Sequence, residues 1–178
     1  MLGEQLGIQL GKMNDKTQRD EELQENISLL AASLSQAHFS FLNVADATLG
    51  IERGLNRTGQ SLAKNDLLFA PPFHDERGET IGERAREVLR QNLNDDIDHA
   101  ILAARLLRLA PNNEMASRQL KEVAETSADQ SLRLVAHESF ASFHKPEVDA
   151  WLIERYRSET PAIRRAILSA LFASKERQ

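Results

Sequence analysis

The stretch that decides the fold is Ala136-His137-Glu138-Ser139-Phe140, in the C-terminal half of the chain. It aligns with an earlier block, Ala103-Ala104-Arg105-Leu106-Leu107, and with a later one, Ile167-Leu168-Ser169-Ala170-Leu171. A period of roughly 30 residues is typical of stacked helical hairpins, because one hairpin alone cannot bury its apolar face. The repeat therefore predicts an all-α fold, a short α-solenoid, with the first and last residue of each block in one continuous core.

Working outward from these blocks, we expect short loops between helices of roughly a dozen residues. Pro146 and Pro161 stand where a first helical residue would stand, a position at which the missing N–H has no helical partner anyway. Thr160 is a good N-cap for the last helix, whereas Lys145 is a poor one for the helix before it. The predicted helices lie near residues 96–109, 113–125, 129–142, 146–157 and 161–174.

The segment 1–64 shows weaker helical patterns. Glycines at positions 3, 7 and 11 interrupt residues 1–14, which we interpret either as a weak helix or as a truncated end. Apolar stripes predict one helix from about Thr17 to Leu34 and another from about His38 to Arg57, the second ended by Thr58-Gly59.

A long irregular connection separates this part from the repeats. Pro71-Pro72 forbid a continuous helix, and Thr80 with Glu83 form a capping box that opens the next helix. We therefore expect a single α-helical domain over residues 1–178, made of less regular helices (1–64), a long loop (65–79) and the helical repeats (80–178).

The composition excludes several classes of function. A net charge of −5 over 178 residues argues against binding to a nucleic-acid backbone. No apolar run approaches the ~20 residues of a membrane-spanning helix, so we predict no membrane span. The absence of cysteine excludes disulfides, Cys-ligated zinc and covalently attached haem. It does not fix the compartment.

No cluster of residues predicts catalysis, a metal or a cofactor. His74-Asp75-Glu76 could ligate a metal or exchange protons, but a solvated charged loop is the preferred interpretation. His137 and His144 would share a helix face only if the helix continued toward Pro146, so we interpret them as surface and loop residues. The sequence holds no phosphate loop, nucleophile elbow or His-Glu-x-x-His. We predict a chain that is not itself an enzyme and needs no cofactor.

One group of residues is a candidate interaction surface: Trp151, Arg155, Arg133 and Arg164. Trp151 is the only tryptophan, and Arg155 follows one helical turn later. Arginine stacked on an aromatic ring recurs in binding hot spots. Packing of Trp151 against the preceding helix is the alternative and the preferred interpretation.

The repeat itself resembles the HEAT repeat. The resemblance rests on Leu132-Arg133-Leu134-Val135-Ala136 followed by Phe140, and on Ile163-Arg164-Arg165-Ala166-Ile167 followed by Leu171. In that family an arginine follows the hydrophobic opening of the second helix, and Arg133 and Arg164 occupy that place. The family usually has an acidic residue six positions earlier, where this chain has serines 127 and 158, so the sequence does not predict the polar ladder between repeats. The resemblance implies that residues 80–178 are HEAT-like repeats.

A narrower resemblance covers about residues 40–178. The segments from Phe143 to Val148, from Leu152 to Tyr156 and from Thr160 to Arg165, with LGIERGLNRTGQSL at 49–62, resemble the helical segment of multidomain proteins known mainly from planctomycetes. In those proteins a β-propeller of the membrane-bound dehydrogenase type precedes HEAT-like repeats, and a cytochrome c domain follows. The resemblance implies a helical piece of a larger, extracytoplasmic, redox-type protein.

We therefore expect a non-catalytic protein-interaction or scaffolding module. Its partner would be another protein or a neighbouring domain of the same polypeptide, and we predict no nucleic-acid partner. The alternative is an enzyme of the HEAT-like DNA glycosylase type. That alternative needs a basic groove, whereas acidic residues are interspersed among Arg84, Arg86 and Arg90.

Overall fold

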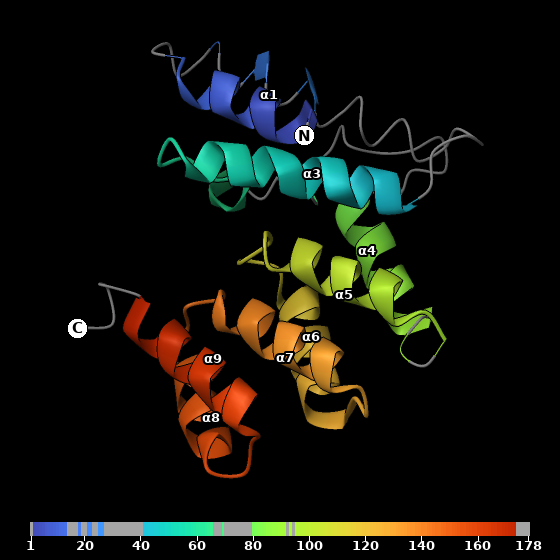
Figure 1. The fold of residues 1–178 in the computed structure, drawn as a ribbon, viewed down its shortest axis with the longest axis vertical. Coiled ribbons are helices and arrows are strands. Elements are labelled where there is room, and N and C mark those ends of the chain that lie inside the picture. The colour runs from blue at the N-terminus through green and yellow to red at the C-terminus, as the bar shows by residue number, and fades with distance from the viewer. Residues whose placement is uncertain are drawn as a thin grey trace. The chain divides into compact units, whose positions relative to one another are not determined.

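The computed structural model describes residues 2–13, 18, 21–22, 25–26, 41–65, 69, 80–91, 93 and 95–173. The regular elements in these ranges are helices, with no strand, so the all-α prediction is confirmed for this part of the chain (Figure 1). Most of the predicted loop at 65–79, including His74-Asp75-Glu76, lies outside the described residues. Contacts between residues divide the chain into two units, Met1–Glu87 and Val88–Gln178, and each is described by itself.

The first unit is built on two helices whose backbones touch. Helix α1 (Leu2–Gly11) lies along α3 (Phe41–Asn56), as Figure 1 shows. A β-carbon on Gly7 would lie 3.0 Å from Cα of Gly54 and would overlap with the carbonyl oxygen of Ile51. A β-carbon on Gly54 would lie 2.7 Å from the backbone nitrogen of Ile8. Only glycine permits this approach, so Gly7, which weakens α1 as an isolated helix, is also the residue at which α1 docks on α3.

The end of α3 is stabilised by a glycine and by a buried carboxylate. Gly59 has a φ of +77°, and the N–H of Gln60 reaches back to the carbonyl of Leu55 at 3.0 Å, as in a glycine C-cap. Glu52 is buried, and its carboxylate accepts hydrogen bonds from Ser61 Oγ (2.7 Å) and the Leu62 N–H (2.6 Å). These bonds fix the start of a short 3₁₀ helix, Leu62–Asn65, relative to α3.

The predicted capping box is present at the start of α4 (Ile81–Gln91). The N–H of Glu83 donates to Thr80 Oγ1 at 3.0 Å, and the N–H of Thr80 donates to the Glu83 carboxylate at 2.8 Å. Each side chain thus satisfies the other residue's backbone donor, which would otherwise have no helical acceptor. Helix α4 begins in the first unit and ends in the second.

Five helices follow in the second unit, and their positions confirm the predicted ones to within two residues. Four of them begin at a polar N-cap, and the fifth, α8, begins at Pro146 after Lys145, which makes no capping bond. The four caps are Asp96, Asn113, Asp129 and Thr160. The helices are α5 (Ile97–Leu107), α6 (Glu114–Thr126), α7 (Gln130–Ala141), α8 (Pro146–Tyr156) and α9 (Pro161–Ala173).

Helix α7 lies at the centre of this unit. It contacts the helices directly before and after it, α6 and α8, and also α5 and α9, the next ones along the chain in each direction (Figure 1). Of the six residues predicted to lie in one core, Leu171 on α9 is half-buried. The other five are buried: Ala103, Leu107, Ala136, Phe140 and Ile167. None of the helices in the described ranges has the length and apolar character needed to cross a membrane.

Candidate binding groove between α6 and α8

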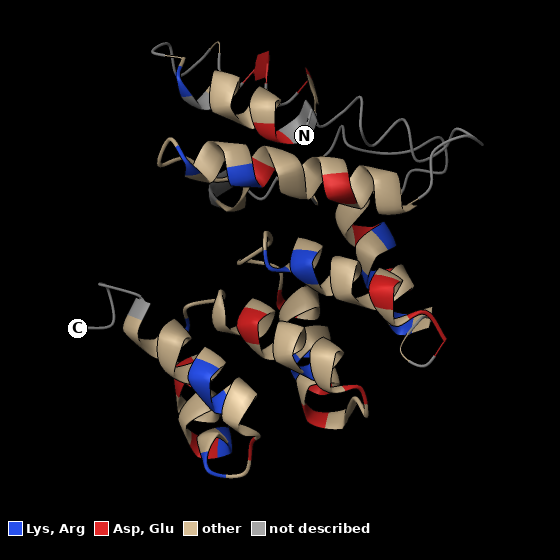
Figure 2. Ribbon diagram, in the orientation of Figure 1, with Lys and Arg blue, Asp and Glu red and all other residues tan. Residues whose placement is uncertain are grey.

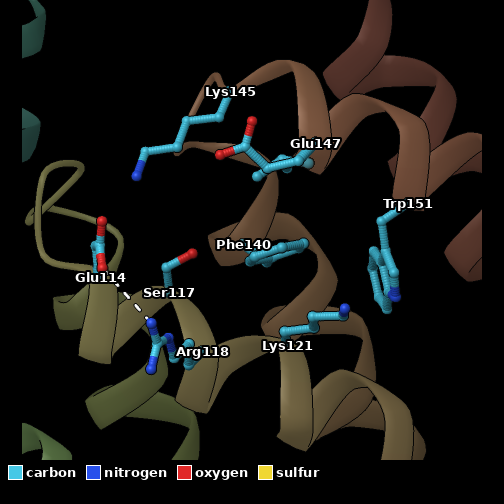
Figure 3. A pocket seen from close by; sticks show the side chains of 9 residues that line it. Glu114, Ser117, Arg118, Lys121, Phe140, Lys145, Glu147 and Trp151 are labelled. Atoms are coloured by element: carbon cyan, nitrogen blue, oxygen red, sulfur yellow. Dashed lines mark ion pairs between the residues drawn. The ribbon is translucent and has the colours of Figure 1, made fainter.

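A groove of about 280 Å³ lies between α6 and the segment that runs from the α7–α8 turn into α8 (Figure 3). Its apolar surface comes from Phe140, Val148 and Trp151, and its polar lining from α6 and the start of α8. Figure 3 shows Phe140 in the middle of the groove, with Trp151 to one side and the charged side chains around it. The polar residues that line it are Glu114, Ser117, Arg118, Lys121, Lys145 and Glu147.

Trp151 is held rigidly at the side of the groove. Its Nε1–H donates to Glu125 Oε1 of α6 at 2.8 Å. Phe140 meets its ring edge-on with 5.1 Å between the ring centroids, a favourable aromatic geometry. Only 8% of Trp151 is exposed. The groove therefore has a preformed wall that costs little conformational entropy when a ligand binds.

The rim carries more free positive than negative charge. Glu114 and Arg118 form an ion pair along α6 at 3.7 Å, so their charges largely offset each other. The ammonium of Lys121 lies 5.8 Å from the centre of the Trp151 ring, within the range of a cation–π contact. Within the described ranges neither Lys145 nor Glu147 forms an ion pair. Two ammonium groups therefore face one carboxylate around an apolar floor.

The turn between α7 and α8 places Lys145 and Glu147 at the mouth of the groove. His144 has a φ of +46°, in the left-handed region that side chains other than glycine rarely adopt. Buried Phe143 anchors the turn, since its ring lies 6.3 Å from that of Phe140. Pro146 then starts α8 immediately. Figure 3 shows the Lys145 side chain extending from this turn toward α6.

A buried charge cluster lies behind Trp151. Glu159, in the turn between α8 and α9, has 1% of its side chain exposed and pairs with Arg133 of α7. Arg155 of α8 lies 3.4 Å from the same carboxylate. His137 Nε2 lies 3.7 Å from Glu159 Oε1. The cluster ties α7 to the α8–α9 hairpin, and two of its members, Arg155 and His137, lie beside the Trp151 ring.

The interpretation of His137 as a surface residue was wrong, because its side chain is buried, and its protonation state follows from its contacts. Its Nδ1 lies 2.9 Å from the carbonyl oxygen of Arg133. A carbonyl only accepts, so Nδ1 carries the proton and neutral His137 has a bare Nε2. Burial lowers the pKa of His137 below its ordinary value of 6.5, and Arg133 and Arg155 act in the same direction. The hydrogen bond to the Arg133 carbonyl and the Glu159 carboxylate oppose that lowering of the pKa.

The structure places the four predicted interaction residues at two locations. Arg133 and Arg155 surround Glu159, and the Arg155 guanidinium lies 5.9 Å from the centre of the Trp151 ring. Arg164 lies apart from them, where its Nη2 donates to the carbonyl of Arg157 at 2.8 Å. Of the four, Trp151 alone lines the groove.

Sequence reasoning missed the acidic partners and the basic rim. Glu125 and Glu159 each lie 26 residues from the side chain that they bind, Trp151 and Arg133. Glu159 stands one residue after the position where the repeat pattern places an acidic residue, so a search one position wider would have found it. The i, i+4 spacing of Arg155 and Glu159 was a second available signal.

Comparison of this chain with protein-family models, with curated proteins and with solved structures found no significant match. Within the described ranges, no three His, Asp or Glu side chains gather closely enough to hold a metal ion. Figure 2 shows that basic and acidic residues both occur among the helices from α5 to α9.

Proposed function

We propose that this chain is a non-catalytic protein-interaction module of HEAT-like helical hairpins, and that the groove between α6 and α8 receives a segment of a partner protein. The single observation that carries this proposal is the groove's construction. An apolar floor fixed by Trp151 and Phe140 is surrounded by charged side chains, two of which, Lys145 and Glu147, form no ion pair with a described residue. Such a site combines an anchor pocket with charge selection at its rim.

The arrangement of α5, α7 and α9 supports the solenoid part of the proposal. Helix α5 contacts α7, and α7 contacts α9, although one helix separates each pair along the chain. Alternate helices of a repeat stack contact each other in this way. The nearly even spacing of the equivalent blocks, which begin at Ala103, Ala136 and Ile167, supports it as well.

The lining favours a partner segment with a large apolar side chain next to one or more carboxylates. The apolar side chain would occupy the groove beside its lining residues Phe140, Val148 and Trp151, and the carboxylates would meet Lys121 and Lys145. Glu147 would disfavour a purely acidic peptide and so contribute to selection. Because Lys121 already lies over Trp151, a bound carboxylate would pair with a cation that is in place.

A random peptide library displayed on phage and selected against the full chain tests the proposal. We expect enriched peptides that combine an aromatic or large aliphatic residue with Asp or Glu, and that change the fluorescence of Trp151, the only tryptophan. Lys121→Glu and Lys145→Glu should each weaken binding about tenfold. The matched control Arg105→Glu, at an exposed position on α5, should leave binding unchanged.

Three outcomes would contradict the proposal. These are a library that yields no binder, binders that tolerate both lysine substitutions, and a short DNA duplex that binds at physiological salt more tightly than any peptide. The last outcome would favour the DNA glycosylase-type alternative, because phosphate binding needs a basic surface.

The sequence resemblance supports a wider proposal about context. We infer that the module works beside redox domains of a larger extracytoplasmic protein, as the helical segment does in the planctomycete-type proteins that it resembles. In that case the parent protein's oxidation chemistry belongs to the propeller and cytochrome domains. The full open reading frame tests this directly: flanking β-propeller or cytochrome c sequences would support it, and their absence would contradict it.

A further inference from the structure

Three helices of the second unit carry equivalent rows of residues at the repeat spacing. Each row has positions four apart, so its members lie on one face of their helix. The α5, α7 and α9 rows are related by the same offsets as the sequence repeat. The rows are Ala100, Ala104 and Arg108 on α5; Arg133, His137 and Ala141 on α7; and Arg164, Leu168 and Phe172 on α9.

The α5 row lies on a helix that contacts the next hairpin, α6 and α7. Ala100 and Ala104 have no exposed surface. At the end of the row, Ser142 Oγ donates to the carbonyl oxygen of Arg108 at 3.1 Å. The first row is therefore buried at two of its three positions, and its helix packs on the next hairpin.

The α7 row is covered by the next hairpin, with a charge added. His137 is 1% exposed and Ala141 is 4% exposed. The α8–α9 hairpin supplies the cover: Trp151 lies 5.3 Å from the His137 ring, and Glu159, in the turn before α9, pairs with Arg133. The cover thus consists of an aromatic side chain and a carboxylate that precedes the second helix of a hairpin.

The α9 row has the same chemistry without the cover. Leu168 is 37% exposed and Phe172 is 75% exposed, whereas their equivalents on α7 are buried. Arg164 turns back on its own hairpin, toward the Arg157 carbonyl (2.8 Å) and the Tyr156 ring (5.8 Å). Unlike Arg133, its equivalent on α7, Arg164 forms no ion pair with a described carboxylate.

We propose that the α9 row is a docking surface for a further helical hairpin supplied by a partner protein. The hairpin would lay an aromatic or large aliphatic side chain on Leu168 and Phe172. It would also bring a carboxylate to Arg164 from the turn before its second helix. The repeated geometry favours a hairpin over other apolar ligands, because a hairpin covers the equivalent row on α7 and the helix that carries the α5 row also packs on one. This surface is separate from the groove between α6 and α8 and does not depend on it.

The chain itself provides the probe. Inserting a second copy of residues 143–173 between Ala173 and Ser174 keeps the spacing of the last two repeat blocks and places a hairpin of known geometry after α9. We expect the extended chain to unfold in one transition, with a Tm raised on the order of 5 °C. Amide exchange should show the copied helices protected.

Substitutions in the row locate the effect. Leu168→Asp and Arg164→Glu should each lower the Tm of the extended chain by several degrees more than that of the unextended chain. In the extended chain, replacing the copy of Glu159 with arginine should restore part of the Tm that Arg164→Glu removes. Arg165→Glu, at an exposed neighbour outside the row, is the control and should shift both chains equally.

Three results would overturn the proposal. In the first, the copied hairpin remains unprotected and the Tm is unchanged. In the second, Leu168→Asp affects both chains to the same extent. In the third, the unextended chain forms a dimer in sedimentation that Leu168→Asp abolishes, which would show that a second copy of this chain covers the row instead.

Discussion

The α1–α3 pair and the α6–α8 pair bring helices together in opposite ways. Gly7 and Gly54 let the backbones of α1 and α3 touch, so no side chain fits between them. Helices α6 and α8 meet instead through Glu125 and Trp151, whose side chains bridge the space. A ligand groove needs the second arrangement, in which large side chains keep two helices apart and are themselves fixed. The contrast explains why we assign binding to the second unit.

The largest expected effect tests the packing that holds the groove open. Phe140→Ala removes a buried ring that contacts both Trp151 and Phe143, and it should lower the free energy of unfolding by about 3–5 kcal/mol. Phe172→Ala is the matched control, because Phe172 is 75% exposed and should change stability little. Urea unfolding measures both. Equal losses from the two substitutions would contradict the assignment of Phe140 to the core.

The next effect tests the charge cluster behind the tryptophan. Glu159→Ala leaves Arg133 and Arg155 without their carboxylate in a largely buried site, which should cost about 3 kcal/mol of unfolding free energy. Glu154→Ala, at an exposed position on α8, should cost almost nothing. Chemical denaturation again provides the measurement. A loss below about 1 kcal/mol would place Glu159 among ordinary surface ion pairs.

The first unit offers a test in which the direction of the stability change, gain or loss, decides whether the two helices touch as described. Alanine normally stabilises a helix relative to glycine by roughly 0.5–1 kcal/mol. Gly54→Ala should do the opposite and cost about 1–3 kcal/mol, because the new methyl group would collide with the backbone of α1. Asp46→Ala, at an exposed position on α3, is the control. If Gly54→Ala raises the melting temperature, α1 and α3 do not cross as described.

The smallest expected effect is a pH dependence that belongs to the second unit. The pKa of His137 is lowered in the folded chain, so below about pH 6.5 the unfolded chain binds a proton that the folded chain does not. Stability should therefore fall as the pH drops from 6.5 toward the folded-state pKa, and this contribution should be constant above pH 6.5. His137→Leu introduces the residue found at the equivalent position 168. It should flatten the plot of stability against pH, because leucine does not titrate. A wild-type curve without this slope would mean that folding leaves the pKa of His137 unchanged, and a slope of the opposite sign would mean that folding raises it.

How much could be predicted from the sequence differs between the two regions. The positions of α5 to α9 followed from the repeat, from Pro146 and Pro161 at first helical positions, and from local capping. The prolines and caps act within a few residues of the chain, and the repeat can be read by aligning the sequence with itself. Gly7 of α1 could be interpreted only as weakening a helix, because the contact that explains it lies on α3, far along the chain.

The groove was beyond prediction for the same reason. Its wall depends on the bond between Glu125 and Trp151, and its support depends on the pairing of Arg133 with Glu159. Each partner lies on a different helix or turn, and only Glu159 left a signal in the sequence, through the repeat pattern and its i, i+4 spacing from Arg155. The sequence singled out Trp151 as a residue of interest, whereas Lys121 and Lys145 looked like ordinary surface charges until the fold placed them around one floor.

The measurement that tests the central claim most directly is amide hydrogen exchange of the full chain with and without a peptide selected from the random library. Our account predicts slower exchange on binding in residues 114–121 and 145–151, with α1 and α3 unchanged. It also predicts that Lys145→Glu abolishes the slowing at the same peptide concentration. Slowing confined to other segments, or an unchanged pattern in Lys145→Glu, would show that the groove between α6 and α8 is not the binding site.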